Sequence, residues 1–207
     1  MKVFVFIIVL ICTLFAQNYW EYDENGEKKV YTVNEYGIKE YQPNTIIEKD
    51  GNTEKTYSVD KYGIKKYQPY STTEKQGNTT NVFDVDKYGI KDNNPHTTTE
   101  KNGNTEEVFN VDKYGIKDYK PHKVIENEGN TKKVYDVDEY GIKDYKPHII
   151  IEKEGNKELY YRVDKYGIKE YKPYKIIEKD NYWFFTQIII IYMWRILINL
   201  SKSNALL

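Results

Sequence analysis

The residues best suited to chemistry in this chain recur in nearly identical surroundings. Three histidines, His96, His122 and His148, each follow a proline, and the single cysteine, Cys12, lies in an apolar stretch near the N-terminus. A metal site needs several ligands at fixed spacing, and no carboxylate accompanies the histidines at such a spacing. Nucleophilic catalysis needs a serine or cysteine beside a base, and no copy stands out as carrying one. We therefore expect no catalytic residue, no metal ligand and no cofactor, so the chain is not predicted to be an enzyme.

One recurring stretch partly matches the start of a calcium-binding loop. In the sequence DVDKYG, residues 84–89, carboxylates alternate as they do where calcium takes its first ligands. However, Tyr88 occupies the third ligand position, and the first aspartate is replaced in other copies by Ser58, Asn110 or Arg162. A short polar side chain at the second position can instead bond the backbone of its own turn. We expect that role for the second aspartate.

Tyrosine is the residue type with the strongest potential for binding. The chain has 22 tyrosines, and their rings can stack on sugar rings or on the surface of a partner. One column of tyrosines opens the motif Tyr-Gly-Ile-Lys and never changes to phenylalanine. We predict a binding role for this column, with packing of each tyrosine into its own turn as the alternative. Its members are Tyr36, Tyr62, Tyr88, Tyr114, Tyr140 and Tyr166.

Two further aromatic columns have different expected roles. In the first, tyrosine exchanges with phenylalanine, which indicates a buried position. Its members are Tyr57, Phe83, Phe109, Tyr135 and Tyr161. The second column shares the predicted binding role, and Asn93 interrupts it. Its tyrosines are Tyr41, Tyr67, Tyr119, Tyr145 and Tyr171.

These columns exist because the chain repeats itself. Each Tyr-Gly-Ile-Lys motif begins 26 residues after the previous one, and all six prolines fall into one further column. The 12 glycines fall into two columns, and Gly26 departs from the regular spacing of its column. Periods of about 20–50 residues are typical of solenoids and of arrays of small structural units. Residues that control the backbone at a fixed phase indicate that every copy turns at the same places.

Each repeat is predicted to form a β-hairpin around a Gly-Asn turn. With that turn in the fifth hairpin, Ile151 faces Tyr160 and Lys153 faces Glu158, so apolar residues meet and opposite charges meet. A shift by one residue in the fourth hairpin would set Ile125 against Lys132. Strand-forming residues dominate and the helical period is absent.

A single repeat cannot bury enough apolar surface to fold alone, so neighbouring copies must pack or pair with one another. We therefore predict an all-β protein built as an elongated array of 26-residue hairpin repeats, either a solenoid or a single-layer meander. Residues 17–181 hold six repeats and the start of a seventh.

The N-terminus has the features of a secretory signal peptide. Lys2 supplies a positive charge, residues 3–15 are apolar, and Ala16 offers a small residue for cleavage. We predict that residues 1–16 are removed and that the protein is exported, either to the cell envelope or to the extracellular space.

The C-terminus departs from the repeat. Residues 182–200 are apolar and long enough for a transmembrane helix, and residues 201–207 form a polar tail. Tyr182 to Leu200 would then anchor the protein in a membrane. A frameshifted end of a longer array and a hydrophobic closing strand are the two alternatives.

Charge and repetition narrow the function. Lys and Arg number 31 against 32 Asp and Glu, and this balance argues against a nucleic-acid-binding protein, which needs a basic face. Near-identical copies suit a scaffold better than a single active site. We predict a non-enzymatic exported spacer or interaction scaffold with a protein or polysaccharide partner. The alternative is a carbohydrate- or cell-wall-binding module that uses the repeated tyrosines.

Overall fold

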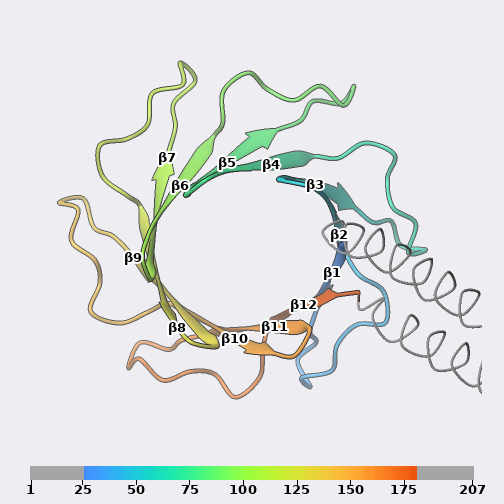
Figure 1. Ribbon diagram of the computed structural model, residues 1–207. Coiled ribbons are helices and arrows are strands. Elements are labelled where there is room, and N and C mark those ends of the chain that lie inside the picture. Colours follow the sequence, from blue (N-terminus) through green and yellow to red (C-terminus); the bar gives the residue numbers. More distant parts are fainter. Residues whose placement is uncertain (1–25, 181–207) are drawn as a thin grey trace, which may run out of the picture.

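The computed structural model describes residues 26–180, which form a closed barrel of antiparallel strands (Figure 1). Every strand pairs with the strand that follows it, and the last pairs with the first. The strands are β1 Glu27–Thr32, β2 Thr45–Asp50, β3 Thr53–Ser58, β4 Ser71–Gln76, β5 Thr79–Asp84, β6 Thr97–Asn102, β7 Thr105–Asn110, β8 Lys123–Glu128, β9 Thr131–Asp136, β10 Ile149–Glu154, β11 Lys157–Arg162 and β12 Lys175–Lys179. The predicted all-β class and hairpin repeats are confirmed.

Each hairpin turns at the predicted Gly-Asn pair. At Gly51 the backbone φ is +56°, and no residue other than glycine has a positive φ in the described part of the chain. A positive φ at the first central position alone is the pattern of a type II′ turn, which matches the twist of paired strands. The predicted register is confirmed, because Ile151 pairs with Tyr160 and Lys153 pairs with Glu158.

Longer loops with a Tyr-Gly corner connect one hairpin to the next. In the loop of residues 59–70, the Asp60 carboxylate accepts hydrogen bonds from the backbone N–H groups of Tyr62, at 2.8 Å, and Ile64, at 2.9 Å. Gly63 has a φ of +82° at this corner, where a side chain would strain the backbone. The turn-bonding role predicted for the second aspartate is therefore confirmed.

The barrel closes because half a repeat lies at each end of the described region. β1 corresponds to the second strand of a hairpin and β12 to the first strand, so each would leave an unpaired sheet edge. They pair in the register of a complete hairpin, with Tyr31 opposite Ile176 as Tyr57 is opposite Ile46. The predicted elongated array is therefore wrong. The sheet is a single-layer meander, but its two edges meet.

The two faces of the sheet become an outer and an inner wall. The loops project away from the barrel axis in Figure 1, and Lys65 of one loop lies over the ring of Tyr57, so the Tyr57 face is the outer wall. On the opposite face Lys28 of β1 reaches Glu54 of β3 at 2.7 Å, across the intervening strand β2. Side chains converge in this way on a concave surface, which identifies the inner wall.

The apolar core is thin. The column from Tyr57 to Tyr161 is buried on the outer wall, as predicted, with Phe109 the least exposed at 5%. Val30 and Val134 are buried on the inner wall, but no side chain within residues 26–180 is less than 2% exposed. Solvent therefore reaches most inward-facing side chains, and the continuous strand ladder carries much of the stability.

Three predicted segments lie outside the described residues: the signal peptide 1–16, the apolar segment 182–200 and the polar tail 201–207. Within residues 26–180, no helix has the length and apolar character needed to cross a membrane.

Candidate binding face formed by the six loops

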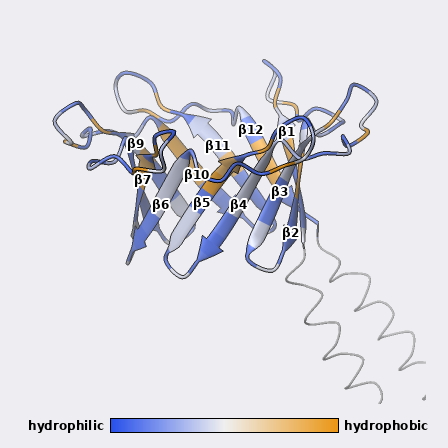
Figure 2. Ribbon diagram, turned by 90° about the horizontal axis from the view of Figure 1, so that it is seen from above, coloured by the Kyte–Doolittle hydropathy of each residue, from blue (hydrophilic) through white to orange (hydrophobic). Residues whose placement is uncertain are grey.

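All six Tyr-Gly loops lie at one end of the barrel, and the Gly-Asn turns lie at the other (Figure 2). We call the six loops together the loop crown. It comprises residues 33–44, 59–70, 85–96, 111–122, 137–148 and 163–174.

The lysine of each Tyr-Gly-Ile-Lys motif fixes its loop to the outer wall. Lys39 donates a hydrogen bond to Glu178 at 2.8 Å, and its Nζ lies 4.0 Å from the centre of the Tyr31 ring. Cation–π contact and ion pairing act together here on one ammonium group. The equivalent lysine–glutamate–aromatic sets are Lys65, Glu48 and Tyr57; Lys91, Glu74 and Phe83; Lys117, Glu100 and Phe109; Lys143, Glu126 and Tyr135; and Lys169, Glu152 and Tyr161.

These lysine–glutamate contacts, which we call loop clamps, lower the pKa of two of the glutamates. The hydrogen bond from Lys143 lowers the pKa of Glu126 below its usual value, against the opposing effect of burial. Burial alone would raise the pKa of Glu178, but hydrogen bonds from Lys39 and Lys157 outweigh it and hold the pKa below its usual value. Both carboxylates are therefore charged at neutral pH and hold their lysines in place.

Each loop also contacts the next one. A Cβ placed on Gly115 would lie 2.9 Å from Oδ1 of Asn94 in the preceding loop. The Asn94 amide also donates a hydrogen bond to the backbone carbonyl of Lys113, at 3.2 Å. The same contact closes the ring, because Lys172 of the last loop donates to the carbonyl of Glu35 in the first. The loop crown is thus one continuous rim.

The tyrosines predicted to bind are exposed on this rim. The Tyr-Gly tyrosines are between 67% (Tyr88) and 78% (Tyr140) exposed, which disfavours the alternative that they pack into their turns. The other four are Tyr36, Tyr62, Tyr114 and Tyr166. In the interrupted column, exposure reaches 96% at Tyr67. Nζ of the preceding lysine lies 4.9 Å from the ring centres of Tyr62, Tyr88 and Tyr114, so one face of each ring is occupied and the other is available to a ligand. The binding role itself stays a prediction.

Sequence reasoning missed the isoleucines of the same motif. No role was predicted for them, yet each is at least 62% exposed. The same isoleucine stands in every copy of a tight corner, where a large apolar side chain has little to pack against. That invariance could have indicated an exposed role. They are Ile38, Ile64, Ile90, Ile116, Ile142 and Ile168.

Grooves separate neighbouring loops. A groove of about 620 Å³ lies between the second and third loops, with Tyr67, Tyr70 and Asp86 in its lining. A groove of about 380 Å³ lies between the last and first loops, where Tyr171 and Asn34 are lining residues. Both grooves are open to solvent, and both combine exposed aromatic rings with hydrogen-bonding groups.

Each of the three histidines is the last residue of a loop, directly before the strand that follows. Nδ1 of His148 is 3.2 Å from a carboxylate oxygen of Asp136, and Nδ1 of His96 is 3.5 Å from Asp84. The sequence spacing did not indicate these aspartates, which lie beside two of the histidines because the two ends of each loop meet. The third, His122, lies where Asn110 replaces the aspartate, and burial lowers its pKa. Among the described residues, no three metal-ligating side chains come together.

Comparisons with known proteins leave the family of this chain open. No protein-family model and no curated protein matches the chain. Among solved structures, the crystal structure of Kluyvelomyces marxianus Hsv2 is similar over 65% of this chain, with 10% sequence identity and a TM-score of 0.26. The similar region spans 62% of that chain, which is less than two thirds of it.

Proposed function

We propose that the protein is a non-enzymatic exported scaffold that binds its partner through the loop crown. The observation that carries this proposal is the ring of exposed tyrosine and isoleucine side chains on one rim, among them Tyr36 at 74% and Ile38 at 62% exposure. Soluble proteins rarely expose apolar side chains in such concentration unless a partner covers them. A spacer needs length, so closure of the barrel favours the interaction role of the scaffold.

Repetition gives the crown several equivalent contact points. Six loops of nearly the same sequence face the same side of the barrel (Figure 2). A partner with repeated features can engage several loops at once, and each further contact then forms within an existing complex. Weak individual contacts therefore add up to firm binding, which suits a repetitive surface or polymer.

The charges of the crown favour a neutral partner. The loops carry nearly equal numbers of lysine and of acidic residues. Many of these are already engaged: Lys65 with Glu48, and Asp60 with its own turn. Aromatic rings, grooves and balanced charge together support the second candidate function, which is binding of a neutral polysaccharide.

The positions of the two ends of the described chain indicate which rim of the barrel would face a partner. Gly26 and Asp180 both lie at the Gly-Asn turn end, where the Gly26 carbonyl accepts from Lys49 N–H and Asp180 N–H donates to the Glu27 carbonyl. If residues 182–200 form a membrane anchor, that anchor leaves the rim opposite the loop crown. The crown then faces away from the membrane, toward an external partner.

The test is a glycan array probed with the full chain and with a triple variant, Tyr62→Ala, Tyr88→Ala and Tyr114→Ala. These side chains project from the rim, so the variant should keep the melting temperature of the parent chain. We expect the parent to bind neutral polysaccharide and the variant to lose at least about ten-fold in affinity, at about 1–3 kcal/mol per stacked ring lost.

The triple Tyr→Phe variant at the same positions is the matched control. It keeps the rings and should keep the binding. If the array shows no ligand, the carbohydrate function fails, and retention of the parent on isolated cell-envelope material tests the scaffold function. Equal retention of parent and Tyr→Ala variant there would refute the crown as the binding face.

A further inference from the structure

The strands separate opposite charges onto the two walls of the barrel. The first strand of each repeat carries Glu-Lys near its end, as in Glu48-Lys49, except where Asn127 replaces the lysine. Alternation along a strand sends the two side chains to opposite walls. The glutamate faces outward and clamps a loop, which leaves the inward lysine without a role in the loop crown.

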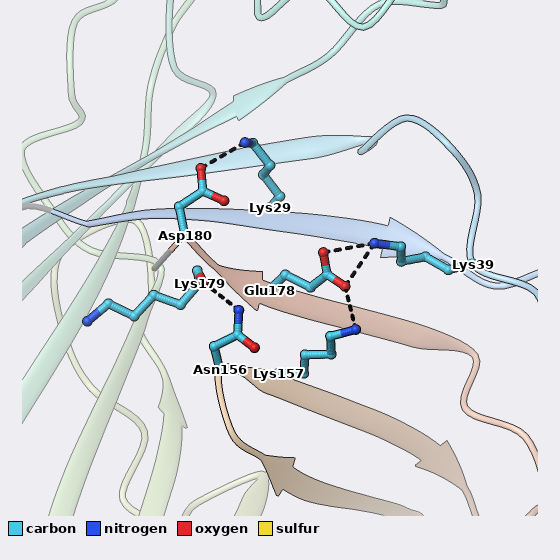
Figure 3. Close-up of polar contacts among 7 residues, drawn as sticks. All are labelled: Lys29, Lys39, Asn156, Lys157, Glu178, Lys179 and Asp180. Carbon is cyan, nitrogen blue, oxygen red and sulfur yellow. Dashed lines mark hydrogen bonds and ion pairs between the residues drawn. The ribbon is translucent and has the colours of Figure 1, made fainter. Parts of the chain in front are cut away.

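We define the inner lysine ring as the inward lysines at these positions. None of them forms an ion pair with another described residue. They are Lys49, Lys75, Lys101, Lys153 and Lys179. In Figure 3 the Lys179 side chain extends away from the neighbouring carboxylates of Glu178 and Asp180.

The acidic residues opposite these lysines are engaged elsewhere. Glu54, which pairs with Lys49 in the ladder, binds Lys28 at 2.7 Å. Glu106, opposite Lys101, accepts a hydrogen bond from Asn127 at 3.1 Å, and Lys132 lies 3.8 Å from it.

The third glutamate that lies opposite one of these lysines also has another hydrogen-bond partner. Glu158, opposite Lys153, accepts a hydrogen bond from the Tyr160 hydroxyl at 3.2 Å. Within residues 26–180 none of these lysines therefore forms an ion pair, although Glu54, Glu106 and Glu158 lie opposite three of them.

Closure of the barrel brings these lysines around one mouth. Lys49, Lys75, Lys101 and Lys153 each lie two residues before the glycine of a Gly-Asn turn, and Lys179, whose repeat has no such turn, pairs with Lys28 at the same end of the barrel. Two strand spacings, about 10 Å between Cα atoms, separate neighbouring members, except that four separate Lys101 from Lys153, on either side of Asn127, and inward-pointing side chains converge further. Lys75, Lys101, Lys153 and Lys179 are exposed and Lys49 is half-exposed, so solutes can reach them.

The inner wall as a whole has a positive field. Its strand residues include twice as many basic as acidic side chains, whereas acidic side chains predominate on the outer wall. A concave surface lined by one sign of charge focuses its field and concentrates ions of the opposite sign. The near-neutral total charge of the chain hides this separation.

We propose that the mouth at the turn end binds an anionic polymer whose phosphate or sulfate groups pair with the inner lysine ring. A polymer fits better than a single small anion, because the lysines are spread around the mouth and successive anionic groups of one chain can reach several of them. This site is separate from the loop crown and lies at the opposite rim.

The experiment titrates the full chain with three probes: inorganic polyphosphate, dextran sulfate and orthophosphate. We expect polyphosphate or dextran sulfate to bind, with an affinity that falls steeply as salt rises, and orthophosphate to bind at least about a hundred-fold more weakly. Binding of one polymer identifies phosphate or sulfate as the preferred group, and binding of both shows that charge density suffices. Absence of polymer binding at low salt would overturn the proposal.

Matched variants locate the site. Lys75→Gln with Lys153→Gln should weaken polymer binding at least about ten-fold. Lys55→Gln with Lys133→Gln removes the same charge from the outer wall and should leave the affinity within about two-fold. Asn127→Lys completes the ring and should tighten binding. Equal losses from the inner and outer pairs would show nonspecific attraction and refute the site.

Discussion

Glu178 of β12 accepts two hydrogen bonds from Lys39 in the first loop, both at 2.8 Å, although 139 residues separate the two in sequence (Figure 3). Lys157 of β11 lies 3.1 Å from the same carboxylate. Within a complete repeat, the equivalent glutamate and lysine are only 17 residues apart, as in Glu48 and Lys65. The junction of β1 and β12 therefore reproduces the contacts of a hairpin without the covalent turn.

The Glu178→Gln variant should weaken this junction. It removes the charge that holds two lysines at a half-buried position, so we expect a loss of about 1–2 kcal/mol in the free energy of unfolding. Denaturant unfolding measures the loss, and hydrogen exchange should show faster exchange in β1 and β12. The control is Glu100→Gln, the equivalent clamp inside a complete hairpin. A loss as large in the control would contradict a special role for the junction.

Acid should loosen the barrel in a defined direction. The folded-state pKa values of Glu178 and Glu126 lie below their usual values. Their contribution to stability is therefore complete above the pKa of an unfolded glutamate, about 4.3, and is lost as pH falls through the lower folded values. We expect a constant melting temperature from neutral pH to about 5 and a decline below about 4. The decline should be smaller in Glu178→Gln, and an identical pH profile would refute its share.

The turn glycine should resist substitution for a backbone reason alone. Gly129 has a φ of +62°, and a Cβ placed there would meet no atom within 4 Å. Gly129→Val should therefore cost more than about 1 kcal/mol through strain and not through a clash. The neighbouring Asn130→Val variant tests the assignment, because that residue has a negative φ. A melting curve unchanged by Gly129→Val would show that the turn does not need glycine.

The hairpin could be predicted from the sequence because all of its determinants are local. Gly-Asn fixes the turn, and the pairing of Ile151 with Tyr160 fixes the register within about a dozen residues. The aromatic column from Tyr57 to Tyr161 was predicted to be buried because its members exchange with phenylalanine. Exposure of the Tyr-Gly tyrosines also follows from their place at a sharp corner.

Closure could not be predicted in the same way. It depends on twist accumulated over all strands, which brings Tyr31 beside Ile176 only at the end of the meander. The segment Lys175–Lys179 was interpreted as the start of a broken repeat, although it is a complete strand whose second partner, β1, comes from the other end of the described chain. The contact of Lys65 with Glu48 and Tyr57 was missed because the three residues lie in different segments. Only the path of the loop brings Lys65 back to the two strands.

The clamp lysine should hold its loop against the wall. In Lys117→Met the side chain keeps its length but loses the ion pair with Glu100, at 2.5 Å, and the cation–π contact with Phe109, at 4.1 Å. We expect faster proteolysis within residues 111–122 and a loss of about 0.5–1.5 kcal/mol in the free energy of unfolding. Lys113→Met is the control, because Lys113 lies over the ring of Tyr114 in its own loop, makes no contact with the wall and has no ion pair among the described residues. Equal sensitivity of both variants would show that the clamp does not order the loop.

Closure of the barrel, which sets all six loops on one rim, is tested most directly by a cysteine pair, Lys28→Cys with Lys179→Cys, in a chain that also carries Cys12→Ser so that no other thiol is present. The two residues are ladder partners across the β1–β12 junction, and Cα atoms of antiparallel partners lie about 4.5–5.5 Å apart, within reach of a disulfide. The closed barrel predicts that mild oxidation forms an intramolecular disulfide in the monomer, while Lys28→Cys with Lys101→Cys forms none. Free thiols after oxidation, or only disulfide-linked dimers, would contradict closure and with it the continuous loop crown.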